Sequence, residues 1–165
     1  MEIINRGDVA MRKKVVDTRE YVSILRELTE EGKEVSLLIA GNSMVPFLVH
    51  ERDYIYFKKP EDDLKKGDMV FFQRDNKAFV MHRIKKVQPE GYYIVGDAQT
   101  TVEGPIRRDQ IFAIITRVKR KGVVVQPGDF WWEFFEHVWI NMVPLRPFFL
   151  KLYSIIFQGK KRAIN

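Results

Sequence analysis

The chain has 165 residues, with 28 lysine and arginine residues against 22 aspartate and glutamate residues, a net charge of +6, and no cysteine. This length is typical of one domain of roughly 100–200 residues with its own hydrophobic core. The absence of cysteine excludes disulfides, thiolate catalysis and cysteine-ligated zinc or iron–sulfur sites. The modest positive charge fits anionic lipid, nucleic acid or solubility alone, and selects none of them.

Residues 1–20 are rich in charged side chains and contain no apolar stretch of the kind that a secretory signal requires. We therefore expect neither a signal nor an anchor at this end. That expectation leaves localisation open between the cytoplasm and the periphery of a membrane.

The first predicted element is a helix over Thr18 to Glu31. Asp17 and Glu20 have the spacing of a capping box, and Tyr21, Leu25 and Leu28 recur on one helical face. Gly32 then supplies the conformational freedom with which helices commonly end.

A series of short β-like runs follows, separated by turn signals such as Gly67-Asp68, Asp75-Asn76 and Lys121-Gly122. The predicted strands are Val35–Ile39, Tyr54–Lys58, Met69–Gln73, Ala78–Val87, Tyr92–Val95, Ile111–Val118 and Val123–Val125. Closely spaced strands without intervening helices favour an antiparallel sheet that coils on itself. The predicted fold is mainly β (α+β), with an N-terminal helical segment (1–34), a β domain (35–126) and an aromatic helical tail (127–165).

The tail is unusual in composition, with ten aromatic residues between positions 130 and 157. Pro127-Gly128-Asp129 predicts the start of a helix, Pro144 and Pro147 predict a break, and Gly159 predicts the end of a second short helix. Arg146 and Lys151 oppose membrane insertion, so we expect no transmembrane helix. Three interpretations stay open: helices packed on the domain, a membrane-surface anchor ending in Lys160, Lys161 and Arg162, or an aromatic groove for a partner helix.

The first segment that is a candidate for a catalytic role is Gly41-Asn42-Ser43-Met44-Val45-Pro46, which follows an apolar run. A glycine before the serine and a proline after it indicate a tight turn at the end of a strand. Such a turn can present the hydroxyl together with its own amide. A serine nucleophile needs a neighbouring base and N–H donors for the developing oxyanion. Alone, the motif is also typical of an ordinary structural turn.

Two further segments supply candidates for that base and for an acidic partner. His82 lies within the predicted strand Val80-Met81-His82-Arg83-Ile84, and a rigid strand suits a general base. Asp97 follows the strand Tyr93–Val95 in a Gly-Asp turn. It either caps its own backbone or orients His82, as the third member of a triad does.

Four motifs in order resemble the signal peptidase I family, over about residues 35–118. They are Gly-x-Ser-Met-x-Pro, Gly67-Asp68 ahead of a hydrophobic strand, His82-Arg83-Ile84 and Val95-Gly96-Asp97. The same clan includes the self-cleaving LexA-type repressors. Histidine at position 82 resembles the archaeal, endoplasmic-reticulum and spore-former branch, since bacterial enzymes have lysine there. The resemblance implies Ser43 as nucleophile, His82 as general base, and Asp97 or Asp109 as the acidic partner. It also implies a peptide substrate bound as an extended strand, with no cofactor.

The chain departs from the family pattern in two places near the motifs. Gly41 stands where bacterial enzymes have a serine hydroxyl that assists the oxyanion, and Ala98 stands where an asparagine often follows the Gly-Asp motif. A LexA-like interpretation is less favoured, because residues 1–34 predict only one helix and no Ala-Gly scissile pair.

The remaining expectations concern partners and function. No base-reading helix is predicted, so we expect no nucleic-acid partner, and the scattered histidines predict no metal site. Lys85 and Lys86 are predicted to be surface charges. The predicted function is a signal peptidase-like serine endopeptidase that cleaves a leader or signal segment. The alternative is a non-catalytic module that binds a peptide or a membrane partner on the same fold.

Overall fold

A computed structural model describes the backbone of residues 18–162 and the side chains of residues 21–155. Helix α1 (Thr18–Glu30) is followed by eight strands. After the strands come helix α2, three short helical turns and helix α3, in that order. The strands are β1 (Val35–Leu38), β2 (Tyr54–Lys58), β3 (Met69–Gln73), β4 (Phe79–Gln88), β5 (Gly91–Val95), β6 (Glu103–Ile106), β7 (Ile111–Arg120) and β8 (Val123–Val125). The later helices are α2 (Phe130–Glu133) and α3 (Arg146–Arg162).

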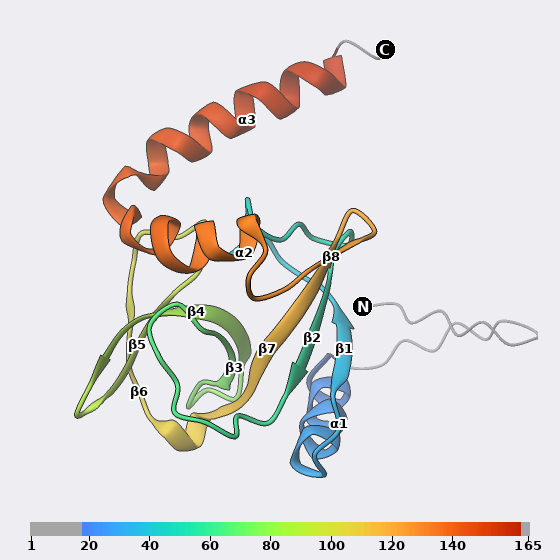
Figure 1. Ribbon diagram of the computed structural model, residues 1–165, viewed down its shortest axis with the longest axis vertical. Coiled ribbons are helices and arrows are strands. Elements are labelled where there is room, and N and C mark those ends of the chain that lie inside the picture. The colour runs from blue at the N-terminus through green and yellow to red at the C-terminus, as the bar shows by residue number, and fades with distance from the viewer. Residues whose placement is uncertain (1–17, 163–165) are drawn as a thin grey trace, which may run out of the picture.

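All eight strands belong to one antiparallel sheet in the order β1-β2-β7-β3-β4-β5-β6, with β8 paired to β7. Register shifts in β2, β3, β4 and β5 help the sheet to coil, because a bulge bends and twists the strand that carries it. Figure 1 shows β3 and β4 curling around one side of the domain, with α1 at one end and α3 at the other. The predicted mainly β (α+β) fold, with an N-terminal helix and a helical tail, is confirmed.

Helix α1 packs on the sheet through the predicted apolar stripe. Val22 and Leu25 are buried in the main core, and Tyr21 and Leu28 pack against it partly buried. The helix ends at Glu30. Gly32 lies in the turn that follows, where its φ of +80° suits glycine, and the amide of Lys33 donates to the carbonyl of Leu28. The predicted capping pair falls outside the residues whose side chains the structure describes.

The main core joins α1, the sheet and the tail. Phe47, from the loop after β1, has no exposed surface and lies against two aromatic rings of the tail, at centroid distances of 6.2 Å to Trp132 and 4.7 Å to Phe135. A second core on the other face of the sheet contains Val70, Phe72, Ile84 and others. The tail is therefore partly a structural element of the domain, as the first of its three interpretations required.

Strand β6 was not predicted, because Gly104-Pro105 in its middle reads as a turn. The structure places it at the edge of the sheet, where it pairs only with β5. Proline lacks a backbone N–H and is tolerated on an edge strand, whose outer side has no neighbour to pair with. An edge position therefore permits a strand that the local sequence argues against.

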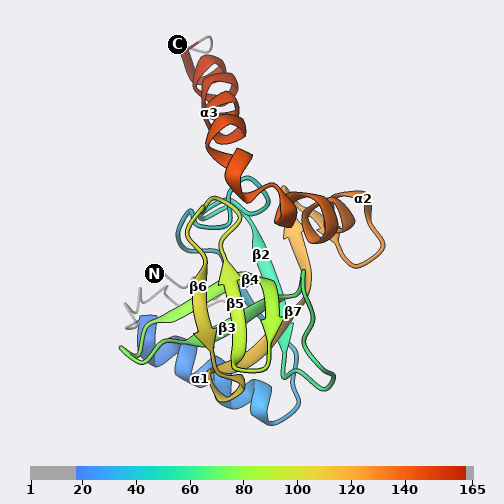
Figure 2. The same ribbon diagram turned by 90° about the vertical axis from the view of Figure 1, so that its left-hand side faces the viewer.

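The tail differs from the predicted pair of short helices. After α2 the chain continues through a π-helical turn (Phe134–Val138) and two 3₁₀ turns (Trp139–Asn141 and Val143–Leu145). The predicted break falls at Pro144, which lies in the second 3₁₀ turn, and at Pro147, which lies in the first turn of α3, where proline is favoured because no N–H partner is lost. The α3 backbone also continues past Gly159 to Arg162. Figures 1 and 2 both show α3 projecting away from the sheet.

Within residues 18–162, no helix has the length and apolarity needed to cross a bilayer.

Replacing Phe47 tests whether the tail is part of the folded core. We expect Phe47→Ala to lower the free energy of unfolding by about 3–5 kcal/mol, because the change leaves a cavity between the sheet and the tail. Chemical denaturation measures this loss. The matched control Phe148→Ala changes a ring that is 68% exposed and should stay within about 0.5 kcal/mol of the parent. Equal losses in the two variants would contradict the shared core.

Candidate active site

Ser43 lies in a compact loop that buried side chains hold at the end of β1. Met44, Phe47 and Leu48 are buried, while Ser43 itself is partly exposed. The amide of Leu48 donates to the carbonyl of Met44 at 2.8 Å, and the amide of Gly41 donates to His50 Nδ1 at 3.0 Å. The loop therefore places Ser43 in a compact turn after β1, fixed by buried neighbours and backbone hydrogen bonds.

His82 lies on the central strand β4, opposite Val70 of β3. Its side chain is 2% exposed, and its ring lies 6.2 Å from that of Phe72, centroid to centroid. Successive residues of a strand point to opposite faces, so Arg83 projects to the other side of the sheet from His82. The strand thus supplies a fixed imidazole on one face and a buried guanidinium on the other.

Ser43 and His82 line one pocket of about 320 Å³. Its walls are mainly apolar and come from α1, β1, β3 and β4, with Val22, Leu37 and Phe71 among them. Arg74 and Gln99 add polar groups to the wall. The predicted nucleophile and base, 39 positions apart in the chain, therefore meet at a cavity with room for an apolar side chain of a peptide.

Gly96 lies between the two candidate residues. A Cβ atom at this position would come within 2.6 Å of the Ser43 carbonyl oxygen and 3.0 Å of His82 Cδ2. The amide of Ala98 also donates to that carbonyl at 2.8 Å. Only glycine leaves room for this approach, which gives the Gly-Asp motif a steric role beside Ser43 and His82.

The His82 imidazole is neutral at physiological pH. Burial lowers its pKa from 6.5 to about 4, with the charge of Glu103 acting to raise the pKa and that of Arg74 to lower it. Its Nδ1 atom is buried and has no hydrogen-bond partner in the described structure. A neutral imidazole is the form that accepts a proton from a serine hydroxyl.

Asp97 has no exposed surface, and its carboxylate pairs with Arg83 through two contacts of 3.3 Å. Burial raises the pKa of the Asp97 carboxyl, and the Arg83 guanidinium opposes that rise. Arg83 Nη1 also donates to the carbonyl of Gly67 at 2.8 Å. The Asp97 carboxylate is thus paired with Arg83 on the opposite face of β4, and does not orient His82 as expected.

Asp109 lies elsewhere. Its side chain is 72% exposed, pairs with Arg107 at 3.1 Å, and borders a different pocket from the one that holds Ser43 and His82. The structure therefore brings together two of the four predicted site residues, Ser43 and His82. It places Asp97 behind them and Asp109 at a separate surface.

Sequence reasoning missed the charged pair whose field reaches His82. Glu103 of β6 accepts two hydrogen bonds from Arg74, at 2.6 and 2.5 Å. The two residues are 29 positions apart. Glu103 directly precedes Gly104-Pro105, the pair of residues because of which strand β6 was not predicted. No local pattern could have paired them.

Lys85, predicted as a surface charge, is half-buried and donates to the carbonyl of Ile140 in the tail at 2.7 Å.

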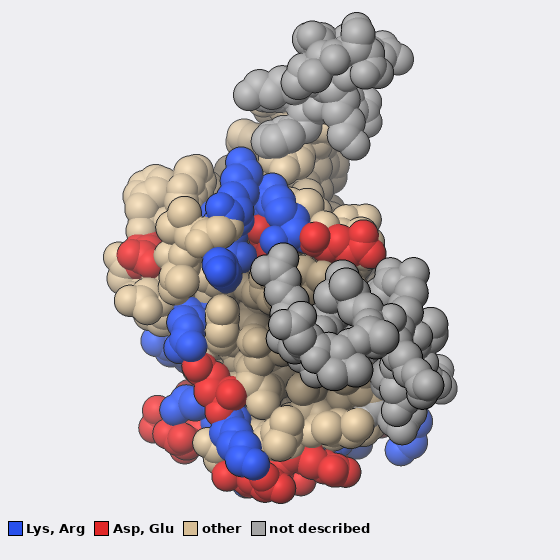
Figure 3. All heavy atoms as spheres, turned by 90° about the vertical axis from the view of Figure 1, so that its right-hand side faces the viewer, with Lys and Arg blue, Asp and Glu red and all other residues tan. Residues whose placement is uncertain are grey.

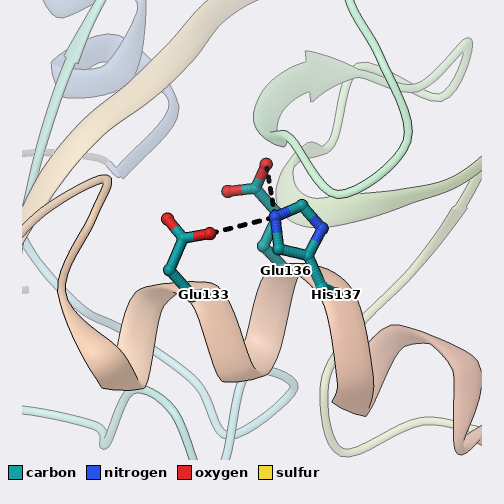
Figure 4. A group of neighbouring side chains, drawn as sticks. All are labelled: Glu133, Glu136 and His137. Atoms are coloured by element: carbon teal, nitrogen blue, oxygen red, sulfur yellow. Dashed lines mark ion pairs between the residues drawn. The ribbon is translucent and has the colours of Figure 1, made fainter.

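Figure 4 shows another cluster, outside the Ser43 pocket, formed by Glu133, Glu136 and His137. Their ligand-type atoms all lie within 4.8 Å of one another, a proximity that helical spacing creates and that scattered histidines did not predict. His137 Nε2 lies 3.0 Å from Glu133, and Glu136 accepts a hydrogen bond from Trp132 Nε1 at 2.7 Å. These are the contacts of a salt-bridge cluster, and we assign no metal to it.

Residues 3–119 match the family model of the Peptidase S24-like proteins. The chain belongs to the Peptidase S24-like family. The match covers most of the chain, including Ser43 and His82, and supports the resemblance to the LexA/signal peptidase clan at the level of the superfamily. Searches among curated proteins and among solved structures gave no match. Membership indicates a serine peptidase that acts on a protein or peptide substrate.

The low pKa of His82 makes stability depend on pH. An exposed imidazole in the unfolded chain has a pKa near 6.5, so the unfolded state takes up the extra proton as pH falls from 6.5 to about 4. We expect the contribution of His82 to the free energy of unfolding to be complete above pH 6.5. As the pH falls through this window, the free energy of unfolding should decrease by up to about 3 kcal/mol. Chemical denaturation at pH 7, 5.5 and 4 measures the fall.

His82→Gln should remove this part of the pH dependence, whereas Ser43→Ala in the same pocket should retain it. Identical slopes in the parent and His82→Gln would contradict a buried neutral imidazole.

Proposed function

We propose that this peptidase is a signal peptidase I-like serine endopeptidase that cleaves a leader or signal segment through a Ser43–His82 pair. The observation that carries the proposal is the meeting of Ser43 and His82 in one largely apolar pocket. The histidine at position 82 supports the histidine-base branch of the resemblance. The apolar walls suit a substrate that offers apolar side chains beside the scissile bond.

The chemistry is acyl transfer. The Ser43 oxygen attacks the carbonyl carbon of the scissile peptide while His82 takes the hydroxyl proton. His82 then returns that proton to the leaving amine as the carbon–nitrogen bond breaks, which leaves an ester on Ser43. Water attacks the ester with His82 again as base, releasing the new carboxyl terminus and restoring the serine. The Ser43 amide is the proposed donor to the oxyanion.

The acidic groups support this pair from a distance. We assign Asp97 to the buried ion pair with Arg83, which fixes the strand and the loop beside His82 and Gly96. Glu103, held by Arg74, is the carboxylate whose charge favours the imidazolium that forms during the reaction. Asp109 takes no part, since it is exposed beside Arg107.

A serine-directed fluorophosphonate probe tests the proposal without a known substrate. We expect the parent protein to be labelled at Ser43, as located by mass spectrometry of the digested protein, and Ser43→Ala to remain unlabelled. His82→Gln should slow labelling by about 10²–10⁴-fold, because the hydroxyl loses its base. The matched control Ser36→Ala changes an exposed serine of β1 and should label at the parent rate.

The alternative, a non-catalytic module that binds a peptide or a membrane partner, makes the opposite prediction. Such a module would show no labelling at Ser43, and Ser43→Ala would bind its partner as the parent does. Binding by Ser43→Ala does not separate the two functions, because an enzyme that loses turnover in this variant also keeps its substrate binding. The absence of labelling at Ser43 in the parent is the result that would remove the enzymatic proposal.

A second proposal concerns the outer face of the tail, which we assign to an anionic membrane surface. Phe130 and Trp131 are exposed on α2, and Leu145, Phe148, Leu152 and Ile155 form an exposed apolar row along the projecting tail. Figure 3 shows basic side chains gathered below α3 on one face of the molecule. Apolar side chains beside basic ones are typical of helices that lie in the interface of a bilayer.

Sedimentation with vesicles of phosphatidylcholine and phosphatidylserine measures this association. Phe148→Asp with Leu152→Asp should weaken binding more than about tenfold, because two apolar side chains no longer leave water. The control Val87→Asp changes a half-exposed residue at the far end of β4 and should bind as the parent does. Absence of parent binding, with a dimer in solution that the double variant abolishes, would favour a partner helix instead.

A further inference from the structure

The loop of residues 96–99, named here the Gly96 loop, has one side against the candidate active site. Gly96 packs on the Ser43 carbonyl and on the His82 ring, and the amide of Ala98 donates to the same carbonyl. Gln99 Oε1 accepts from the amide of Gly96 at 3.2 Å and closes the loop on itself. The position of this loop therefore sets how Ser43 and His82 meet.

The other side of the loop is held by the tail. Arg146 has no exposed surface, and its Nη1 donates to the carbonyls of Gly96 at 2.7 Å and Gln99 at 2.9 Å. Trp139 Nε1 donates to the carbonyl of Asp97 at 2.9 Å. Three carbonyls of the four-residue loop thus accept hydrogen bonds from two side chains of the tail.

Arg146 also holds the tail segment itself together. Its Nη2 donates to the carbonyl of Trp139 at 3.2 Å, and its guanidinium carbon lies 5.6 Å from the centroid of that indole ring. A guanidinium is costly to bury unless it is well paired. Here that cost is offset by charge-assisted bonds to three carbonyls and by attraction to the Asp97 carboxylate.

We propose that Arg146 and Trp139 are positioning residues of the active site, which hold the Gly96 loop against Ser43 and His82 from behind. This inference rests on the proposed peptidase function. Both residues lie beyond position 119, where the family match ends. The tail therefore completes the site with a support that the matched part of the chain does not contain.

Two variants test whether Arg146 and Trp139 hold the Gly96 loop in place, with little change to the core. Arg146→Lys keeps a positive charge but has a single nitrogen in place of Nη1, which bonds the two loop carbonyls, and Nη2, which bonds the carbonyl of Trp139. Trp139→Phe keeps an aromatic ring and removes only the Nε1 donor. The matched control is Arg117→Lys, an arginine of β7 that pairs with Glu34 outside the Ser43 pocket.

The rate of fluorophosphonate labelling at Ser43 is measured as a function of pH for each folded variant, with the melting temperature recorded alongside. We expect the two test variants to be labelled about 10–100-fold more slowly than the parent, because a small misplacement of reacting groups lowers the reaction rate by such a factor. Arg117→Lys should match the parent.

The pH profile separates positioning from simple loss of stability. A loosened Gly96 loop admits water to the imidazole, which faces Arg74, Glu103 and the ring of Phe72. The midpoint of labelling should then rise from about 4 toward the ordinary value near 6.5. The midpoint is taken from the labelling rate divided by the fraction of folded protein at each pH, so that acid unfolding of a less stable variant does not shift it.

The outcomes distinguish the two proposals. If the parent is not labelled at Ser43, the peptidase function fails. If the parent is labelled but both variants keep its rate and midpoint, or lose rate only in proportion to their unfolded fraction, the positioning role is overturned.

Discussion

The buried ion pair between Arg83 and Asp97 is the interaction on which the site depends. It joins the middle of β4 to the loop after β5. Arg83 is the chain neighbour of His82, which lines the pocket, and Asp97 is the chain neighbour of Gly96, which packs on Ser43 and His82. Removing one member of such a pair leaves an unpaired charge in the interior and is strongly destabilising. The Arg83 guanidinium also lies 5.3 Å from the centroid of the Phe47 ring, in the loop that carries Ser43. One buried charge pair thus sets the relation of three segments that meet at the site.

Burial has a chemical consequence on the opposite face of β4. His82 is enclosed by the sheet, and this enclosure, more than any charged neighbour, lowers its pKa. The same enclosure shields the imidazole from solvent and keeps it unprotonated at neutral pH, which is the form that the proposed role as a general base requires. With Nδ1 unpartnered, the imidazole is held by packing and strand geometry instead of by a carboxylate. In the proposed mechanism the site is therefore a Ser–His pair in a pocket with mainly apolar walls, with no carboxylate bonded to His82 Nδ1 among the described residues.

The tail has two faces with different physical roles. Its inner face contributes Trp132, Phe135 and Trp139 to the main core, and Lys85 and Arg146 fasten it to β4 and to the Gly96 loop. Its outer face leaves Phe148, Leu152 and Ile155 in solvent along a helix that projects from the domain. The unusual aromatic content of the tail is accounted for in part by this division. Trp132, Phe135 and Trp139 build the domain, whereas Phe130, Trp131 and Phe148 are exposed and remain available to a surface outside it.

The sequence by itself determined the elements whose signals are local. The apolar stripe of α1, the alternating strands of the sheet, and the turn that presents Ser43 all follow from residues close together in the chain, as does a histidine on a strand. Strand β6 and the course of the tail did not follow, because an edge position tolerates Pro105 and a helix start accommodates Pro147. Those outcomes depend on neighbours in space.

Only the tertiary structure decided which charges meet. Asp97 lies in a Gly-Asp turn whether it faces His82 or Arg83, and the alternation of side chains along β4 gives it to Arg83. Glu103 and Arg74, or Arg146 and the Gly96 loop, are brought together by folding across tens of residues. A short motif determines the type of chemical group and its local backbone. The low dielectric and fixed distances of the folded interior determine the pairing and the pKa of that group.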